Sequence, residues 1–133
     1  MTLVREAMVV EPSSLGVEAT AEEAGKLLAN PDVRAVFVCD DQRLVGVVTR
    51  KTLVREVVAQ GRDPSATRLG DFAEPPHYTV EAAAAADDAF RFMEEQDAEH
   101  VPVVEDGRLV GVLSRVVLQR RLAEDEPPDE EEA

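Results

Sequence analysis

Apolar residues in this chain gather in short runs separated by polar turns, and two of these runs have nearly the same sequence. Residues 43–53 read Arg-Leu-Val-Gly-Val-Val-Thr-Arg-Lys-Thr-Leu, and residues 108–118 read Arg-Leu-Val-Gly-Val-Leu-Ser-Arg-Val-Val-Leu. The correspondence holds without a gap from Val4/Leu69 to Val57/Leu122. An internal repeat fixes the unit of folding, which here is one copy of roughly 55 residues.

The first copy begins with an amphipathic helix. Thr20 and Glu23 have the spacing of a capping box, in which each side chain accepts a hydrogen bond from the other residue's backbone N–H. Apolar residues then follow on one helical face: Ala24, Leu27 and Leu28. The helix is expected to end near Asn30, which precedes a proline.

A buried β-hairpin comes next in the first copy. The runs 35–39 and 44–48 are almost continuously apolar, which is typical of strands buried on both faces. Thr49 ends the second strand and can cap a helix that runs to residue 58. Gly61 is well placed as the left-handed residue that terminates this helix.

The second copy repeats the same order of elements. We expect an alanine-rich helix from residue 82, strands over 101–104 and 109–113, and a last helix over 116–123 that Ser114 caps. Asp106-Gly107 is a strong hairpin turn. Pro102 lacks an N–H for the strand ladder, so it should lie at the start or edge of its strand. Shorter pieces are expected as well: a helical turn over 3–8 and extended segments over 15–17 and 78–80.

These patterns predict an α/β (α+β) fold with two tandem β-α-β-β-α repeats. The expected boundaries are 1–61 for the first repeat, 62–67 for a linker, 68–123 for the second repeat and 124–133 for a disordered acidic tail. One copy alone has too little apolar surface to cover its sheet. We therefore expect the copies to pack about a pseudo-twofold axis, which would create two related clefts.

Charge and composition narrow the functional classes. The formal net charge is −14, and half of this excess lies in the last ten residues. Such a balance disfavours nucleic-acid phosphates and anionic membrane surfaces as partners. No apolar run approaches the roughly 18 residues that a membrane span needs, and the N-terminus does not read as a signal peptide. The single cysteine, Cys39, predicts a reducing cytoplasm, and its apolar run favours a buried small hydrophobe over a reactive thiol.

The candidate chemistry does not include catalysis or a metal centre. No cluster of Cys, His and Asp has metal-ligand spacing. No Ser-His-Asp or Cys-His arrangement has a signature context either. We therefore expect neither an enzyme nor a metal site.

The repeated pattern resembles the cystathionine-β-synthase (CBS) domain, and two in tandem resemble a Bateman module. The resemblance covers nearly the whole chain from Val4 to Ala123. In the second copy it rests on Thr79-Val80, the helix near Ala89, His100 to Val104, and Gly111 to Ser114. In the first copy it rests on Ala24, Val36 to Val38, and Gly46 to Thr49. The resemblance implies a stand-alone CBS protein that binds AMP, ADP, ATP or S-adenosylmethionine in its clefts, regulates other proteins and is not catalytic.

Physical chemistry supports an anion site at the two strand-to-helix junctions. Thr49 and Ser114 each stand at a helix start, where free backbone N–H groups and the helix dipole favour a phosphate. Arg50, Lys51 and Arg115 add positive charge nearby. The alternative is that both hydroxyls only cap their helices and the basic residues are solvated.

One departure from the family pattern ranks the two clefts. In ligand-binding members an Asp three positions after the Thr/Ser bonds the ribose, whereas this chain has Thr52 and Val117 there. Loss of a charge-assisted hydrogen bond costs roughly 1.5–3 kcal/mol. Since Thr52 still offers a hydroxyl, the Thr49 cleft is the better candidate. The resemblance also implies that His100 reaches the phosphates held at Thr49, and that Arg34 or Ala35 does so at Ser114. The alternative for His100 is a partly exposed residue at a strand edge.

The expected ligand-binding residues form two groups. The group at the better cleft is Ser14, Ala35, Val36, Thr49, Arg50, Lys51, Thr52 and His100, with the adenine near Val36. The group at the weaker cleft is Thr79, Val101, Pro102, Ser114, Arg115 and Val117.

Two functions remain open from the sequence. The first is a regulatory module that binds an adenosyl ligand and acts on an unknown protein partner in trans. The second is a degenerate CBS pair that serves as a dimerisation or interaction scaffold without ligand. A homodimer is expected in either case, formed through the helix faces Leu53/Val57 and Val117/Leu122, because exposed apolar patches invite association.

Overall fold

The computed structural model describes residues 1–10 and 12–125, which form two compact units. One unit contains the described residues from 12 to 77 together with 106–109, and we call it the first-copy unit. The other contains residues 1–10, 78–105 and the described residues from 110 onward, and we call it the second-copy unit. Each unit therefore takes the N-terminal segment of the other copy's sequence.

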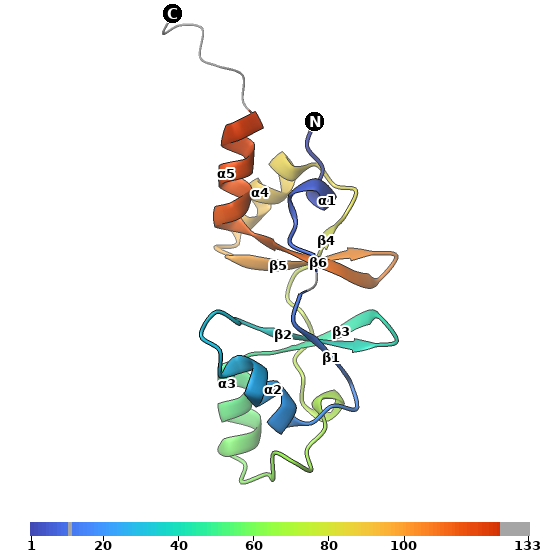
Figure 1. Ribbon diagram of the computed structural model, residues 1–133, viewed down its shortest axis with the longest axis vertical. Helices are drawn as coiled ribbons and strands as arrows, with labels where there is room; N and C mark the ends of the chain where they lie inside the picture. The colour runs from blue at the N-terminus through green and yellow to red at the C-terminus, as the bar shows by residue number, and fades with distance from the viewer. Residues whose placement is uncertain (11, 126–133) are drawn as a thin grey trace, which may run out of the picture. The chain divides into compact units, whose positions relative to one another are not determined.

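The first-copy unit is a three-stranded sheet with helices on one face (Figure 1). Strand β1 (Ser14–Gly16) runs parallel to β2 (Val36–Asp40), which pairs antiparallel with β3 (Arg43–Val48). Helix α2 (Ala21–Leu28) and helix α3 (Arg50–Leu53) lie against this sheet, and a π-helical turn over Val54–Val58 continues α3. A short 3-10 turn covers Leu69–Asp71. The hairpin and both helices were predicted from the sequence, and the structure confirms them.

The core of this unit is aliphatic. Its buried residues are Ala21, Ala24, Leu28, Val36, Val38, Val48, Val57, Leu69 and Phe72. Val57 is only 2% exposed because its helix face packs onto the sheet. The predicted exposed face Leu53/Val57 is therefore wrong: Val54 and Val58, at 58% and 69%, are the exposed valines of this helix.

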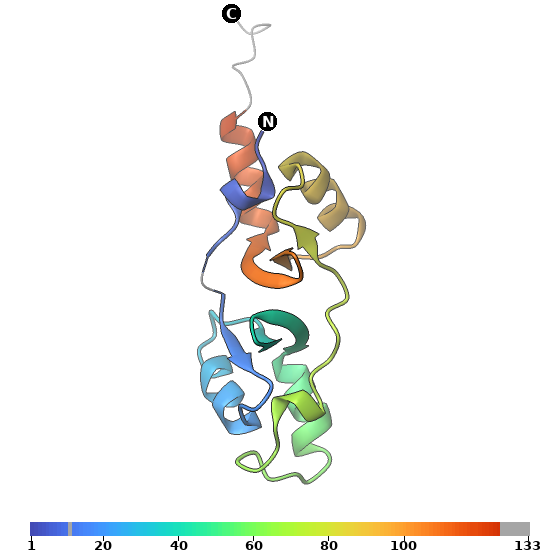
Figure 2. The ribbon, with the colours of Figure 1, turned by 90° about the vertical axis from the view of Figure 1, so that its right-hand side faces the viewer.

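The second-copy unit has the strand order β6-β5-β4. Its strands are β4 (Val80–Glu81), β5 (His100–Glu105) and β6 (Arg108–Ser114), and its helices are α1 (Val4–Ala7), α4 (Ala86–Glu95) and α5 (Arg115–Asp125). Strand β4 runs parallel to β5, with Val80 opposite Val103. Helix α1 packs against α4 and α5 (Figure 2). Pro102 lies near the start of β5, just before this pairing begins.

The alanine-rich segment departs from prediction. A helix was expected from residue 82, but α4 begins only at Ala86. The preceding alanines form a turn and a bend that bond to the N-terminal segment: the Val4 and Arg5 N–H groups donate to the carbonyls of Ala84 and Ala82 at 2.9 and 3.0 Å. Tertiary hydrogen bonds therefore override the helix propensity of alanine.

The turns and ends follow their sequence signals. Gly61 and Gly107 have φ of 67° and 79°, as their predicted left-handed positions require. The last helix, expected over 116–123, runs to Asp125. The rest of the expected acidic tail lies outside the described residues. Among the described residues, no helix is long and apolar enough to cross a membrane.

Candidate functional site

Thr49 and Thr52 cap each other at the start of α3, and we call this place the Thr49 corner. The Thr49 N–H donates to Thr52 Oγ1 at 3.1 Å, and the Thr52 N–H donates to Thr49 Oγ1 at 3.3 Å. The two hydroxyl oxygens are 3.0 Å apart and share a hydrogen bond. Thr52 is 1% exposed, whereas Thr49 is half-buried. In this geometry the Thr52 hydroxyl serves the cap and presents no surface to solvent.

Arg50 ties the start of α3 to the end of α2. Its Nη2 donates to the carbonyl oxygens of Leu28 and Asn30, at 2.5 and 2.8 Å. Carbonyls at a helix C-terminus lack intrahelical donors and carry partial negative charge, so a guanidinium stabilises them. The side chain of Lys51 is exposed at the same helix start. Helix geometry leaves the N–H groups of Arg50 and Lys51 without intrahelical acceptors.

Strand register brings three further predicted residues to this end of the sheet. Ser14 lies opposite Phe37 on β2, and Val36 lies opposite Val48 on β3. Ala35 directly precedes β2, whose partner β3 ends at Val48, next to Thr49. Ser14 is exposed, Ala35 is half-buried and Val36 is buried. All the residues predicted for the better cleft except His100 thus belong to the first-copy unit; His100 is exposed at the start of β5 in the second-copy unit.

The corresponding junction of the second-copy unit, which we call the Ser114 corner, is more loosely capped. Ser114 Oγ accepts from the Val117 N–H at 3.5 Å, and Val117 is 41% exposed. The Arg115 N–H donates to the Glu99 carbonyl at 2.9 Å, and its guanidinium lies 3.4 Å from Asp97 Oδ1.

The other residues predicted for the weaker cleft lie at the same end of this sheet. The Val80–Val103 register sets Thr79 beside Pro102. Thr79 is exposed, whereas Val101 and Pro102 are buried.

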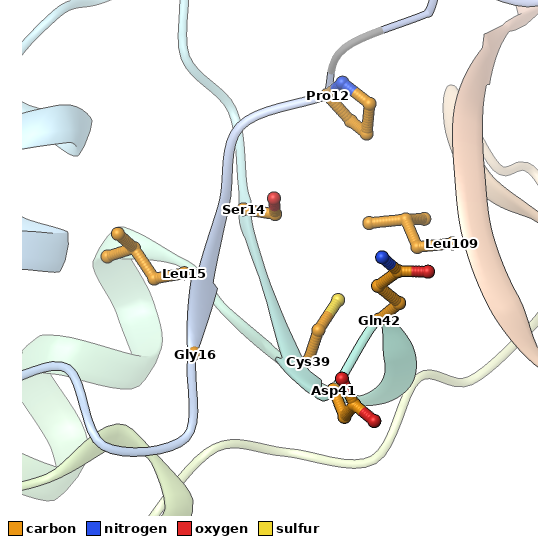
Figure 3. Close-up of a pocket in the computed structure, with 8 residues that line it drawn as sticks. All are labelled: Pro12, Ser14, Leu15, Gly16, Cys39, Asp41, Gln42 and Leu109. Atoms are coloured by element: carbon orange, nitrogen blue, oxygen red, sulfur yellow. The ribbon is translucent and has the colours of Figure 1, made fainter.

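A cavity of about 380 Å³ lies beside β1, at the turn between β2 and β3 (Figure 3). Its lining residues are Pro12, Ser14, Leu15, Gly16, Cys39, Asp41, Gln42 and Leu109. Of these, only Ser14 was predicted as a site residue. The sequence feature that could have pointed to this cavity is the turn Asp41-Gln42, which has a glutamine where the second copy has the glycine of Asp106-Gly107.

Among the residues that the structure describes, no three His, Cys, Asp or Glu side chains lie close enough together to hold a metal ion. Cys39 is half-buried, and its burial raises the pKa of the thiol. The thiol is therefore a neutral lining group at physiological pH.

Two similar three-stranded sheets covered by helices, each with a Thr or Ser where its last strand meets a helix, define a tandem α/β module. The CBS domain family model matches this chain twice, over residues 4–59 and 69–124. The protein belongs to the CBS domain family and contains a pair of these domains.

The chain is similar to proteins of comparable length. It is 32% identical to Hypoxic response protein 1 of Mycobacterium tuberculosis over 125 residues, which cover 93% of this chain and 87% of that protein. A crystal structure of Hypoxic Response Protein I with two coordinated zinc ions has a TM-score of 0.77 and 30% identity, and covers 91% of this chain and 99% of that one.

A crystal structure of CBSX2 in complex with AMP has a TM-score of 0.73. It is 24% identical over 92% of this chain and 96% of that one, which supports the shared fold.

Proposed function

We propose that this CBS pair is a regulatory module that binds an adenine nucleotide or S-adenosylmethionine at the Thr49 corner and acts on a partner protein in trans. The observation that carries the proposal is the convergence of Thr49, the start of α3 and the Ala35–Val36 segment at one end of the first-copy sheet. The AMP bound by CBSX2 supports the ligand class, because it shows that this fold accommodates an adenine nucleotide in that protein.

The paired hydroxyls leave one proton for a ligand. Either oxygen can be the donor in the bond between Thr49 and Thr52. If Thr52 donates to Thr49 Oγ1, the Thr49 proton is free to point at a phosphate or ribose oxygen. Every other polar atom of the cap keeps its partner in that arrangement. Thr52 is then a positioning residue that acts through Thr49, and hydrogen bonds in such a chain reinforce one another.

Charge at the corner comes from Lys51 and the helix start. Because the Arg50 guanidinium is bound to the carbonyls of α2, Lys51 is the cation that can approach a phosphate without breaking a contact with the core. The N–H groups of Arg50 and Lys51 add the donors that anions find at helix N-termini. The adenine ring would lie along the backbone of Ala35 and Val36, whose peptide groups would read its polar atoms.

The Ser114 corner is the weaker candidate for the same chemistry. Val117 offers no hydroxyl to orient Ser114, and Asp97 lies against the guanidinium of Arg115. That carboxylate opposes a phosphate at this corner. We therefore expect one strong site per chain.

Calorimetric titration with AMP, ATP and S-adenosylmethionine tests the proposal. Thr49→Ala should weaken binding of the best of these ligands about tenfold, since it removes a donor to a charged group. Thr49→Ser keeps the hydroxyl and should bind like the wild type. Ser114→Ala is the matched control in the other copy and should leave affinity unchanged.

Melting temperatures of the same variants separate binding from folding, because a ligand bound only by the folded state raises the melting temperature. If Ser114→Ala abolishes binding while Thr49→Ala retains it, the ligand binds at the Ser114 corner and the proposed site is wrong. No binding of any of the three ligands would leave the chain as a scaffold.

A further inference from the structure

The cavity beside β1 is a built feature at the turn end of the β2–β3 hairpin. Figure 3 shows the Cys39 sulfur and the Gln42 amide directed between Ser14 and Leu109. The Leu109 N–H donates to the Gln42 carbonyl at 3.0 Å, which holds the turn in place. Its volume of about 380 Å³ lies within the range of small-ligand sites, which is roughly 300–1,000 Å³.

Residue 42 of this turn is a glutamine, although its backbone conformation favours glycine. Asp41 and Gln42 have φ of 50° and 74°, in the left-handed region. The equivalent turn of the second copy has Asp106 and Gly107 at 53° and 79°, which is the usual sequence for this turn. Glycine at residue 42 would relieve the strain, yet the chain places there a side chain that reaches the cavity. Strain of this kind in a native structure points to a use for the side chain.

A β-bulge adjoins the same cavity. Val38 pairs with Gly46 but Cys39 pairs with Leu44, so Val45 has no partner on β2. Bulges of this type re-aim side chains and are frequent beside functional sites. Here the bulge adjoins Cys39, whose sulfur lines the cavity.

The lining determines the kind of ligand. Asp41 supplies a carboxylate, Gln42 an amide, Ser14 a hydroxyl, and Pro12 and Leu109 supply apolar surface. None of the described residues that line it is a Lys, Arg or His. We propose that this cavity is a second ligand site, which binds a small organic cation with an ammonium group at Asp41 and an apolar body against Pro12 and Leu109.

Cys39 provides the assay, because it is the only cysteine of the chain. A ligand in the cavity should slow alkylation of Cys39 by iodoacetamide. Three probes of one shape test the charge: 2-phenylethylamine, 2-phenylethanol and phenylacetate. At millimolar concentration the amine should protect Cys39 severalfold, the alcohol less, and phenylacetate not at all. AMP at saturation should not protect it, which keeps this test separate from that of the Thr49 corner.

Two variants test the assigned residues. Asp41→Asn should weaken protection by the amine about tenfold and leave protection by the alcohol unchanged. Asp106→Asn, the matched change in the second copy, should have no effect. Gln42→Gly should raise the melting temperature by relieving the left-handed strain, and should nevertheless weaken binding. If Gln42 only shaped the turn, Gln42→Gly would raise the melting temperature without weakening binding of the amine.

Equal protection by the amine and by phenylacetate would overturn the proposal, as would no protection by the amine. An unchanged response to the amine in Asp41→Asn or in Gln42→Gly would also overturn it. In each variant, protein NMR spectra with native dispersion establish that the fold is intact.

Discussion

Replacing Thr52 by valine tests how the Thr49 corner is built. Thr52 is 1% exposed, and its Oγ1 lies 3.1 Å from the Thr49 nitrogen and 3.0 Å from the Thr49 hydroxyl. Valine has nearly the same shape, so the change removes two hydrogen bonds and creates no cavity. The Thr49 N–H then lies at a partly buried position without its acceptor.

The cost follows from the contacts that are lost. Loss of a helix cap typically costs about 1 kcal/mol, and an unpaired buried donor costs about 1–3 kcal/mol. Because Thr49 is only half-buried, we expect a loss of about 1–2 kcal/mol in the free energy of unfolding. For a chain of this size that is a fall of roughly 4–8 °C in melting temperature. If Thr49 presents its proton to the nucleotide as proposed, the affinity for AMP should also fall severalfold, and Thr52→Ser, which keeps the hydroxyl, should restore the affinity.

Urea unfolding and calorimetric titration of the same samples provide the measurements. The matched change is Val117→Thr, which gives the Ser114 corner the second hydroxyl that it lacks and should raise stability by a few tenths of a kcal/mol. A loss below about 0.5 kcal/mol in Thr52→Val would refute the capping argument, since typical caps contribute more than this. A normal loss of stability with unchanged AMP affinity would refute only the role of Thr52 in positioning Thr49.

Three further predictions concern other parts of the chain. Arg50→Met should lower the free energy of unfolding by about 1–2 kcal/mol, because two carbonyls at the end of α2 lose their donor. Arg115→Met loses only an exposed ion pair and should cost less than about 1 kcal/mol. Equal losses of the two variants in urea unfolding would contradict this. Burial raises the pKa of Cys39, so its alkylation should reach half-maximal rate at a higher pH in the folded chain than in urea. The folded state should also lose stability as the pH rises through the folded pKa. An alkylation midpoint at lower pH in the folded chain than in urea would contradict this. The exposed valines Val54 and Val58 favour a homodimer, and light scattering that gives a monomer mass at micromolar concentration would exclude it.

The parts of the fold that the sequence predicts are those whose signals are local. The Thr20–Glu23 capping box forms with distances of 3.0 and 3.2 Å, because both partners lie within one helical turn. The Asp106-Gly107 turn follows from the backbone preference of glycine. The internal repeat also gives each element two independent sequence signals, one in each copy, and the family pattern is clear from the two together.

Features that depend on distant contacts were not predictable. The alanines before α4 form a turn and a bend whose carbonyls accept from the N-terminal segment, and no pattern near residue 82 contains that information. The contacts of Arg50 with the carbonyls of Leu28 and Asn30 join positions that are 22 and 20 residues apart, with two strands between them, so no local pattern predicts them. The cavity required the fold to bring β1, the β2–β3 turn and Leu109 together.

The two copies have diverged in opposite ways at their two ends. At the strand-to-helix end, the first copy has a pair of interlocked hydroxyls, whereas the second has a weak cap and an exposed valine at residue 117. At the hairpin turn, the second copy has the unstrained Asp-Gly sequence, whereas the first has Gln42 in a left-handed conformation. Selection for folding alone would favour the better cap and the unstrained turn in both copies. The first copy has the better cap, but it keeps the strained turn, and that strain is the reason to look for a ligand at the hairpin turn.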